Sequence, residues 1–330
     1  RISKITMTAK NYIQTKLDDL EKPLGIQKPT NRDELVGAIF RTLMSKKFRK
    51  TSANETLQEH IKEAIKIRLE KNEPINITFL HGAYKLWRLE EAPEVDWAEL
   101  FALMHYAKWL KPICEMYEPG VWFDLFVDDL IVPHLGTASV EDVNTYLKSY
   151  HELVVFLGNF LPDNFKMSIT TVGSRFDSIE AFEKSLKESI ELMQLELPDG
   201  LPVLTDTDKA RAELNTNPSA EQLQDSKWRE KVVLVETAYS RTKAEPGYHN
   251  ASDKILAFTS SIPGRAIAVG STKDSIAKFW VGVGALKPAK DNFRQIVLTP
   301  KQLESLGFSW QNIDLDINGK NFKRIRVLST

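Results

Sequence analysis

Two apolar segments joined by a long helix decide the fold: residues 75–80 (INITFL) and residues 121–127 (VWFDLFV). Between them, Asp96-x-x-Glu99 has the spacing of a capping box and predicts a helix that begins at Trp97 and ends near Tyr117. A Pro-Gly turn then leads into the second segment. Strand, helix and strand in this order predict two parallel neighbours of one sheet.

The same alternation extends on both sides of this unit. Amphipathic helices are expected near 32–46 and 56–71, before the first strand. After the second strand, the sequence predicts a helix from Ser139 to about Leu157, a strand over Phe165–Val172 and a helix from about Asp177 to Met193. We therefore predict an α/β fold, Rossmann-like, with a largely parallel sheet flanked by helices.

The second half has a different character. Its short segments are rich in β-branched residues and separated by Gly and Pro, which predicts strands with few helices. The last forty residues predict a strand, a helix from Pro300 and a hairpin that turns at Asn318-Gly319, which together make a small β-rich C-terminal appendage. The strands expected before this appendage cover Lys231–Tyr239, Lys254–Ser260, Arg265–Gly270 and Lys278–Ala285.

These elements suggest three parts. Residues 1–73 form an N-terminal helical segment, residues 74–285 form the Rossmann-like core, and residues 286–330 form the appendage. Any site for a small molecule is expected in the core, because ligands of α/β proteins sit at the carboxyl ends of the strands.

Composition limits the classes of function. The chain of 330 residues has a formal net charge of −1, so no overall field favours nucleic acid or an anionic membrane. No apolar run of membrane-spanning length occurs, and the start, from Arg1 to Lys4, lacks the apolar core of a signal peptide. We expect a cytoplasmic protein that acts on small molecules, while the oligomeric state stays open. Cys114 is the single cysteine and is expected to be an inert core thiol.

Charged side chains follow both decisive strands. His81, Lys85 and Arg88 come at and after the end of the first strand, and can hold a phosphate or carboxylate by charge-assisted hydrogen bonds. Lys85 and Arg88 equally fit a solvated loop. Asp128 and Asp129 follow the second strand, where two neighbouring carboxylates raise one another's proton affinity and suit acid/base chemistry. We take His81, Asp128 and Asp129 as the candidate catalytic residues. The alternative is that one of them caps the next turn.

The second half offers further candidates for substrate binding. Tyr239 and Arg241 are expected to close one strand, and Arg265 follows a Pro-Gly turn. Lys278 and Trp280 combine a charge with a flat ring, which suits an aromatic or sugar ligand, although Trp280 also fits an ordinary core position.

Common catalytic motifs are missing from the sequence. It contains no Gly-x-Gly-x-x-Gly, no P-loop, no Gly-x-Ser-x-Gly and no His-Glu-x-x-His. An iron site built from His81, Asp129 and His134 is conceivable, and would make the chain an iron-dependent oxygenase. A third possibility is a binding protein without catalytic activity.

A family resemblance rests on segments that span about 80 residues in a fixed order. They are Phe79-Leu80-His81, residues 93–103 (PEVDWAELFAL), Pro112-Ile113, Tyr117-Glu118-Pro119-Gly120, Phe123, Asp128-Asp129, residues 140–143 (VEDV) and Tyr146. Together they resemble the core of the isocyanide (isonitrile) synthases of the pyoverdine/dityrosine type. The pattern departs from that family at Asp128 and Leu130, where the family has Ser and Gly.

The resemblance implies an enzyme that condenses the α-amino group of an amino acid with ribulose 5-phosphate to form an isocyanide, with no metal or nucleotide cofactor. It implies that Lys85 and Arg88 hold the phosphate, and that Asp128 or Asp129 matches the acidic residue of the family. Residues 278–280 would correspond to the family's Thr-Pro-Trp.

Overall fold

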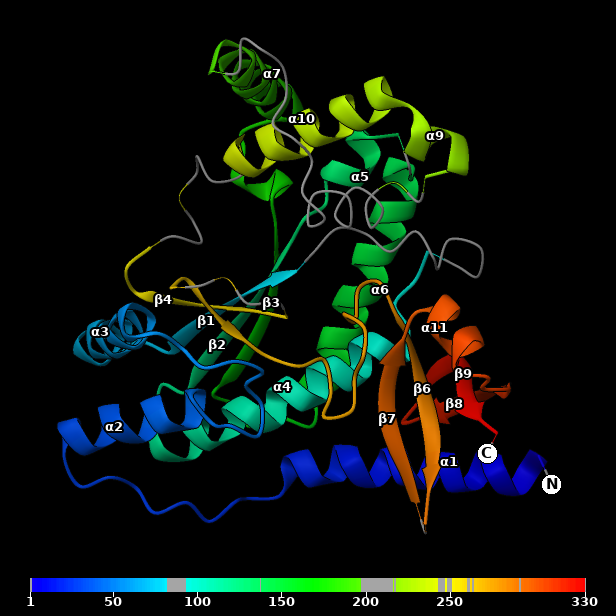
Figure 1. Ribbon diagram of the computed structural model, residues 1–330. Helices are drawn as coiled ribbons and strands as arrows, with labels where there is room; N and C mark the ends of the chain where they lie inside the picture. The colour runs from blue at the N-terminus through cyan, green and yellow to red at the C-terminus, as the bar shows by residue number, and fades with distance from the viewer. Residues whose placement is uncertain are drawn as a thin grey trace.

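A five-stranded parallel sheet forms the centre of the molecule, with strand order β3-β2-β1-β4-β5 (Figure 1). The computed structural model describes residues 2–81, 93–136, 138–196, 216, 218–242, 247, 251–259, 262, 264–290 and 292–329. The strands of the central sheet are β1 (Ile75–His81), β2 (Val121–Val127), β3 (Phe165–Thr171), β4 (Lys254–Phe258) and β5 (Ala266–Ala268).

Helices flank this sheet and extend beyond its carboxyl edge. Figure 1 shows α4 running along the sheet, while α7 and α10 lie beyond the strands. The helices are α1 (Ile2–Glu21), α2 (Arg32–Leu43), α3 (Glu55–Lys71), α4 (Trp97–Met116), α5 (Ile131–His134), α6 (Val140–Gly158), α7 (Ile179–Glu196), α9 (Ala220–Gln224), α10 (Ser226–Thr242) and α11 (Pro300–Ser305), with a short 3-10 turn η2 (Gly173–Arg175).

Helix α4 is the crossover between β1 and β2 and is buried on almost every side. The Asp96 carboxylate accepts a hydrogen bond from the Ala98 amide (2.6 Å), and the Glu99 carboxylate accepts one from the Asp96 amide (3.0 Å), which confirms the expected capping box. On the sheet side, the ring of Tyr106 packs against Phe79 and Phe123, with centroids 4.8 and 5.6 Å away. An apolar helix fits here because it lies between the sheet and other helices.

A separate mixed sheet forms the C-terminal part, with strand order β7-β6-β9-β8. Its hairpin turns at Asn318 and Gly319, whose φ angles of 52° and 81° lie in the left-handed region as a tight primed turn requires. The strands are β6 (Val283–Ala289), β7 (Asn292–Leu298), β8 (Trp310–Ile317) and β9 (Lys320–Leu328). The predicted fold class, a parallel sheet flanked by helices with a small β-rich C-terminal part, is therefore confirmed. The division into residues 1–73, 74–285 and 286–330 stays a prediction.

The prediction of a strand over Lys231–Tyr239 is wrong, because this segment lies within helix α10. Its valines favour a strand locally, but the buried positions Val232, Val235 and Tyr239 recur at helical spacing. Helix α10 packs on α7, where the ring of Tyr239 lies 5.9 Å from that of Phe182, and this tertiary contact decides in favour of the helix. Tyr239 and Arg241 therefore lie on a helix and do not close a strand.

The expected strand over Lys278–Ala285 is also corrected: β6 begins only at Val283. Residues 278–282 form turns, with the Gly282 amide donating to the Lys278 carbonyl (2.9 Å). Successive side chains of a strand point to opposite faces, whereas Phe279 and Trp280 are both buried against the ring of His81.

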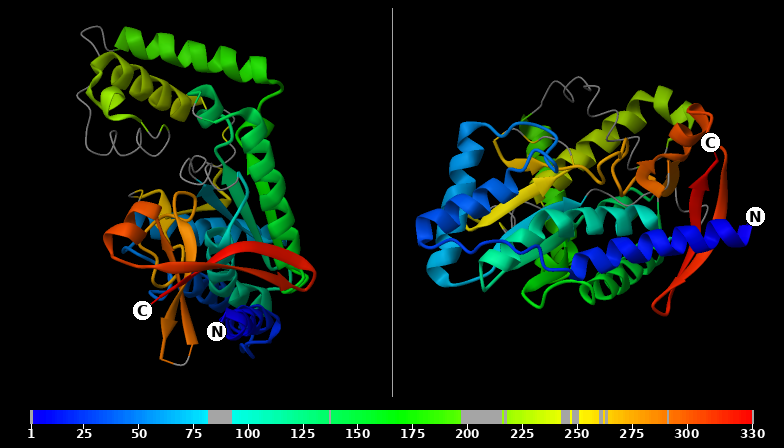
Figure 2. Two further views of the ribbon diagram at one scale, coloured as in Figure 1. Left: turned by 90° about the vertical axis from the view of Figure 1, so that its right-hand side faces the viewer. Right: turned by 90° about the horizontal axis from the view of Figure 1, so that it is seen from below.

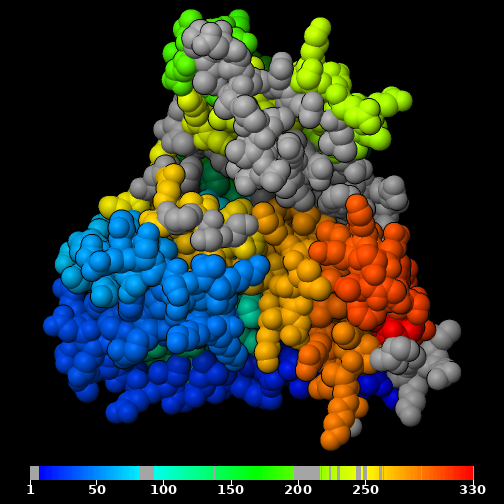
Figure 3. Space-filling view, viewed as in Figure 1, coloured from blue at the N-terminus to red at the C-terminus, as the bar shows by residue number. Residues whose placement is uncertain are grey.

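Helices α7 and α10 pack on each other and stand at the end of the molecule farthest from α1 (Figure 2, left). In the space-filling view they rise above the wider body that contains α1–α3 and the C-terminal sheet (Figure 3). Within the described part of the chain, no helix combines the length and the apolar character that crossing a membrane requires.

We predict that the Cys114 thiol of the native protein does not react with thiol reagents at pH 8. Cys114 is only 8% exposed, and burial raises the pKa of its thiol to about 12, so little reactive thiolate forms. Colorimetric thiol titration should detect it only after addition of denaturant. Rapid labelling of the folded protein would contradict this.

The contact between the C-terminal sheet and α4 depends on Gly284. A Cβ atom at this position would lie 2.5 Å from both the amide nitrogen of Ala98 and the carbonyl carbon of Trp97. These are backbone atoms of α4, which can move only by distorting the helix. We therefore predict that Gly284→Ala lowers the free energy of unfolding by roughly 1–3 kcal/mol. Urea denaturation tests this, with Gly158→Ala as control, since nothing lies within 4 Å of a Cβ there. Equal stabilities of the two variants would contradict it.

Candidate functional site

The parallel pairing of β1 with β2 brings the first set of predicted site residues to one edge of the sheet. In this pairing His81 lies opposite Val127, so Asp128 follows directly beside the end of β1. The expected right-handed strand-helix-strand unit thus places His81 and the acidic pair at neighbouring carboxyl ends. We call this edge, defined by His81, Asp128 and Asp129, the crevice; the name refers to the position at the carboxyl ends of the strands, where α/β proteins bind their ligands.

Asp129 is half-buried and is held by the backbone of the turn that follows β3. Its Oδ1 accepts a hydrogen bond from the Gly173 amide (3.0 Å). Burial raises the pKa of the Asp129 carboxyl, and the negative charge of Asp128 adds to the rise, while the Gly173 amide opposes it. A Cβ at residue 173 would lie 2.8 Å from Asp129 Oδ2, so a larger residue there would displace the carboxylate.

Asp128 meets helix α10. The Tyr239 hydroxyl donates to Asp128 Oδ1 across a long contact of 3.4 Å. The Tyr239 ring is 3% exposed, and its hydroxyl pKa lies well above the usual value because of burial and because of the two aspartates. Tyr239 therefore stays a neutral hydrogen-bond donor beside Asp128.

His81 lies deeper than the aspartates, with only 2% of its surface exposed. Its Nε2 is 3.2 Å from the hydroxyl of Tyr146 on α6. That hydroxyl in turn donates to Glu99 Oε1 on α4 (3.0 Å). Neither partner was among the predicted catalytic residues, although Glu99 is visible in the sequence as the third residue of the α4 capping box.

Trp280 and Lys278 reach the same edge from the turns that precede β6. The Trp280 ring lies 5.2 Å from that of His81 and stacks on Phe258, at the end of β4, at 5.3 Å. The Lys278 ammonium lies over both rings, 5.6 Å from Trp280 and 5.3 Å from Phe258. Trp280 is only 2% exposed, so its ring packs beneath the edge of the sheet and does not face solvent. Lys278 is the more accessible of the two residues.

Other candidates lie elsewhere. Arg241 is exposed and its guanidinium pairs with Glu196 (2.7 Å). Arg265 is exposed and precedes the amino end of β5, not a carboxyl end. His134 is exposed on α5. Lys85 and Arg88 lie outside the described residues.

The described residues include no group of three His, Cys, Asp or Glu side chains arranged to hold a metal ion. The iron site considered above would need His81, Asp129 and His134 close together. These three side chains therefore do not form such a group. The geometry gives no support to the iron-dependent oxygenase.

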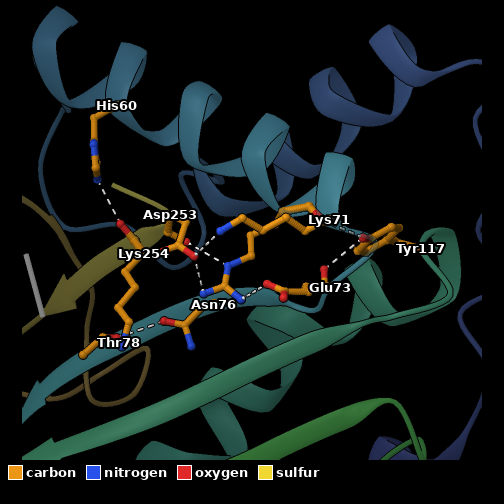
Figure 4. Close-up of polar contacts among 9 residues, drawn as sticks. His60, Lys71, Glu73, Asn76, Thr78, Tyr117, Asp253 and Lys254 are labelled. Atoms are coloured by element: carbon orange, nitrogen blue, oxygen red, sulfur yellow. Dashed lines mark hydrogen bonds and ion pairs between the residues drawn. The ribbon is translucent and has the colours of Figure 1, made fainter. Parts of the chain in front are cut away.

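A second polar cluster was missed by the sequence analysis. Asp124, in the middle of β2, is fully buried, and its Oδ1 accepts from Ser168 (2.7 Å) and Thr170 (2.8 Å) on β3. Lys254 at the start of β4 reaches toward Asn76 and Thr78 of β1 (Figure 4). Burial lowers the pKa of Lys254 to about 8, although the charges of Asp124 and Asp253 oppose this.

This cluster stabilises the sheet at a distance from the crevice, since Lys254 pairs with the amino half of β1. The signal that could have revealed it is a charged residue in the apolar run VWFDLFV, because a buried charge needs partners.

Comparisons with known proteins give one informative result. Neither a protein-family model nor a curated protein matches the sequence. The crystal structure of the PvcA protein from Pseudomonas aeruginosa has a similar fold, with a TM-score of 0.62 over 89% of this chain and 100% of PvcA. The two sequences are 14% identical, so the similarity establishes a shared fold.

The raised pKa of Asp129 predicts a pH-dependent cost in stability. The pKa of Asp129 is higher in the folded protein than in the unfolded chain. Between these two pKa values the folded protein binds more protons than the unfolded chain, so its stability falls as pH rises through this range. Asp129→Asn removes the charge and keeps an acceptor for the Gly173 amide. We predict that the variant gains stability relative to wild type between pH 4 and pH 7, measured by urea denaturation; a difference that does not change with pH would contradict this.

Proposed function

We propose that this chain is an isonitrile synthase-like enzyme that condenses the amino group of an amino acid with ribulose 5-phosphate in the crevice. The observation that carries the proposal is the position of His81, Asp128 and Asp129 at the neighbouring carboxyl ends of two paired parallel strands. These residues belong to the segments that resemble the isonitrile synthases of the pyoverdine/dityrosine type. The fold shared with PvcA points in the same direction.

The two carboxyl groups differ in a way that suits this condensation. An amino acid arrives as an ammonium ion and must lose a proton before its nitrogen attacks the sugar carbonyl. Asp128 serves as the base for this proton. Asp129 holds a proton more readily than an exposed aspartate, because burial and the charge of Asp128 raise its pKa, and it donates that proton to the departing water.

Tyr239 supplies the third polar group on this side of the crevice. Its neutral hydroxyl donates to Asp128 and keeps that carboxylate oriented. Lys278 supplies a cation on the side of β4, within reach of a ligand placed over Phe258. Lys85 and Arg88 complete the proposal as the phosphate-binding groups, as the family resemblance implies.

We predict that Asp128→Asn and Asp129→Asn each lower turnover by roughly 10²–10⁴-fold, the usual contribution of a positioned acid or base. The assay is isocyanide formation from amino acids and ribulose 5-phosphate, followed by mass spectrometry, with circular dichroism to verify folding. Gly173→Ala serves as a milder perturbation, since its Cβ displaces the Asp129 carboxylate without removing it. Wild-type turnover in both Asn variants would contradict the assigned roles.

Phosphate binding can be tested separately. Arg88→Ala should weaken the binding of ribulose 5-phosphate by about 1.5–3 kcal/mol if the contact is charge-assisted. Calorimetry measures the dissociation constant. Arg32→Ala is the matched control, because Arg32 forms an exposed ion pair with Glu70. Equal affinities of the two variants for ribulose 5-phosphate would contradict the assignment of Arg88. If the wild-type protein binds ribulose 5-phosphate but forms no isocyanide from any amino acid, it is a binding protein without catalytic activity.

A further inference from the structure

A chain of hydrogen bonds lies beneath the crevice and ends at His81. Glu99 Oε1 accepts from the Tyr146 hydroxyl (3.0 Å), whose oxygen lies 3.2 Å from His81 Nε2. The exposed fractions of Glu99, Tyr146 and His81 are 0%, 2% and 2%. The three residues come from α4, α6 and β1, so tertiary packing alone brings them together.

The number of protons in this chain determines the direction of each bond. A tyrosine hydroxyl has one proton, and Tyr146 donates it to Glu99 Oε1. The second oxygen of Glu99 accepts from the Asp96 amide (3.0 Å), so both oxygens of Glu99 are acceptors. The Tyr146 oxygen then has only lone pairs to offer to His81, so Nε2 must carry a proton.

We propose that Glu99, acting through Tyr146, fixes the tautomer of His81 with the proton on Nε2. The lone pair of the neutral imidazole is then on Nδ1, and Nδ1 is the ring nitrogen that takes up and releases protons. Glu99 and Tyr146 are positioning residues in this arrangement. The catalytic use of His81 rests on the proposed function, whereas the assignment of the tautomer rests on the hydrogen bonds alone.

The surroundings of His81 make the opposite tautomer costly. Its ring is packed between aromatic side chains, with centroids 4.9 Å from Phe279, 5.2 Å from Trp280 and 5.4 Å from Tyr150. This packing limits rotation of the imidazole away from Tyr146. A bare Nε2 would place two lone pairs against each other in a buried site, where leaving a polar contact unsatisfied is unfavourable.

Nitrogen NMR of protein labelled with ¹⁵N at histidine tests the tautomer directly. Wild-type His81 should show a pyrrole-type Nε2 and a pyridine-type Nδ1, with its signals assigned by their loss in His81→Asn. In Tyr146→Phe the acceptor is removed while the ring remains, so a mixture of tautomers should appear. In Glu99→Gln the α4 capping box is retained, because Gln also serves at that position, and the single-tautomer signature should weaken.

Tyr150→Phe is the matched control. Tyr150 also packs on His81, but among the described residues its hydroxyl has no hydrogen-bond partner, so its removal should leave the signature unchanged. A wild-type His81 protonated on Nδ1 would overturn the inference. An equal response of Tyr150→Phe and Tyr146→Phe would also overturn it, because packing alone would then explain the tautomer.

Kinetics adds a readout that depends on the proposed function. Tyr146→Phe should lower kcat by about tenfold or more with little change in KM, since the geometry of the acid/base group is disturbed and substrate contacts are not. If the wild-type protein forms no isocyanide, the proposed function fails while the NMR result still decides the tautomer. A wild-type kcat in Tyr146→Phe would show that turnover does not depend on the contact between Tyr146 and His81, and would overturn the positioning role of Tyr146.

Discussion

The parallel pairing of β1 with β2 is the constraint on which the rest of the molecule depends. Two parallel strands need a crossover, and α4 can serve as one only because it is apolar on nearly every side. The same pairing sets His81 level with Val127, which fixes where Asp128 must follow. The architecture and the crevice are therefore consequences of one register.

Two aspartates of the β2 region show how the same side chain takes different roles in different surroundings. Asp124 is fully buried, and two hydroxyl groups and the nearby charge of Lys254 compensate its charge. Asp129 is half-buried beside a second carboxylate, and burial raises the pKa of its carboxyl although a backbone amide donates to it. The first aspartate takes part in the hydrogen bonding of the sheet, and the second lies at the edge of the sheet with a raised proton affinity.

The sequence predicts those parts of the fold that local patterns determine. β1, α4 and β2 were found because apolar runs, a capping box and a Pro-Gly turn mark their limits. Helix α10 was missed because its valines favour a strand, and only packing against α7 decides otherwise. The link from His81 to Tyr146 was missed for a similar reason: the residues are 65 positions apart, and no local pattern records such a contact.

The misread helix also contributes a polar group to the crevice. α7 and α10 pack on each other, and α10 brings Tyr239 to Asp128. The pKa of the Tyr239 hydroxyl is raised by burial first and by both aspartates next, so the phenol stays protonated beside the acidic pair. One hydrogen-bond donor of the crevice therefore comes from a helix that follows β2 by about a hundred residues and lies outside the strand-helix-strand unit that positions the carboxylates.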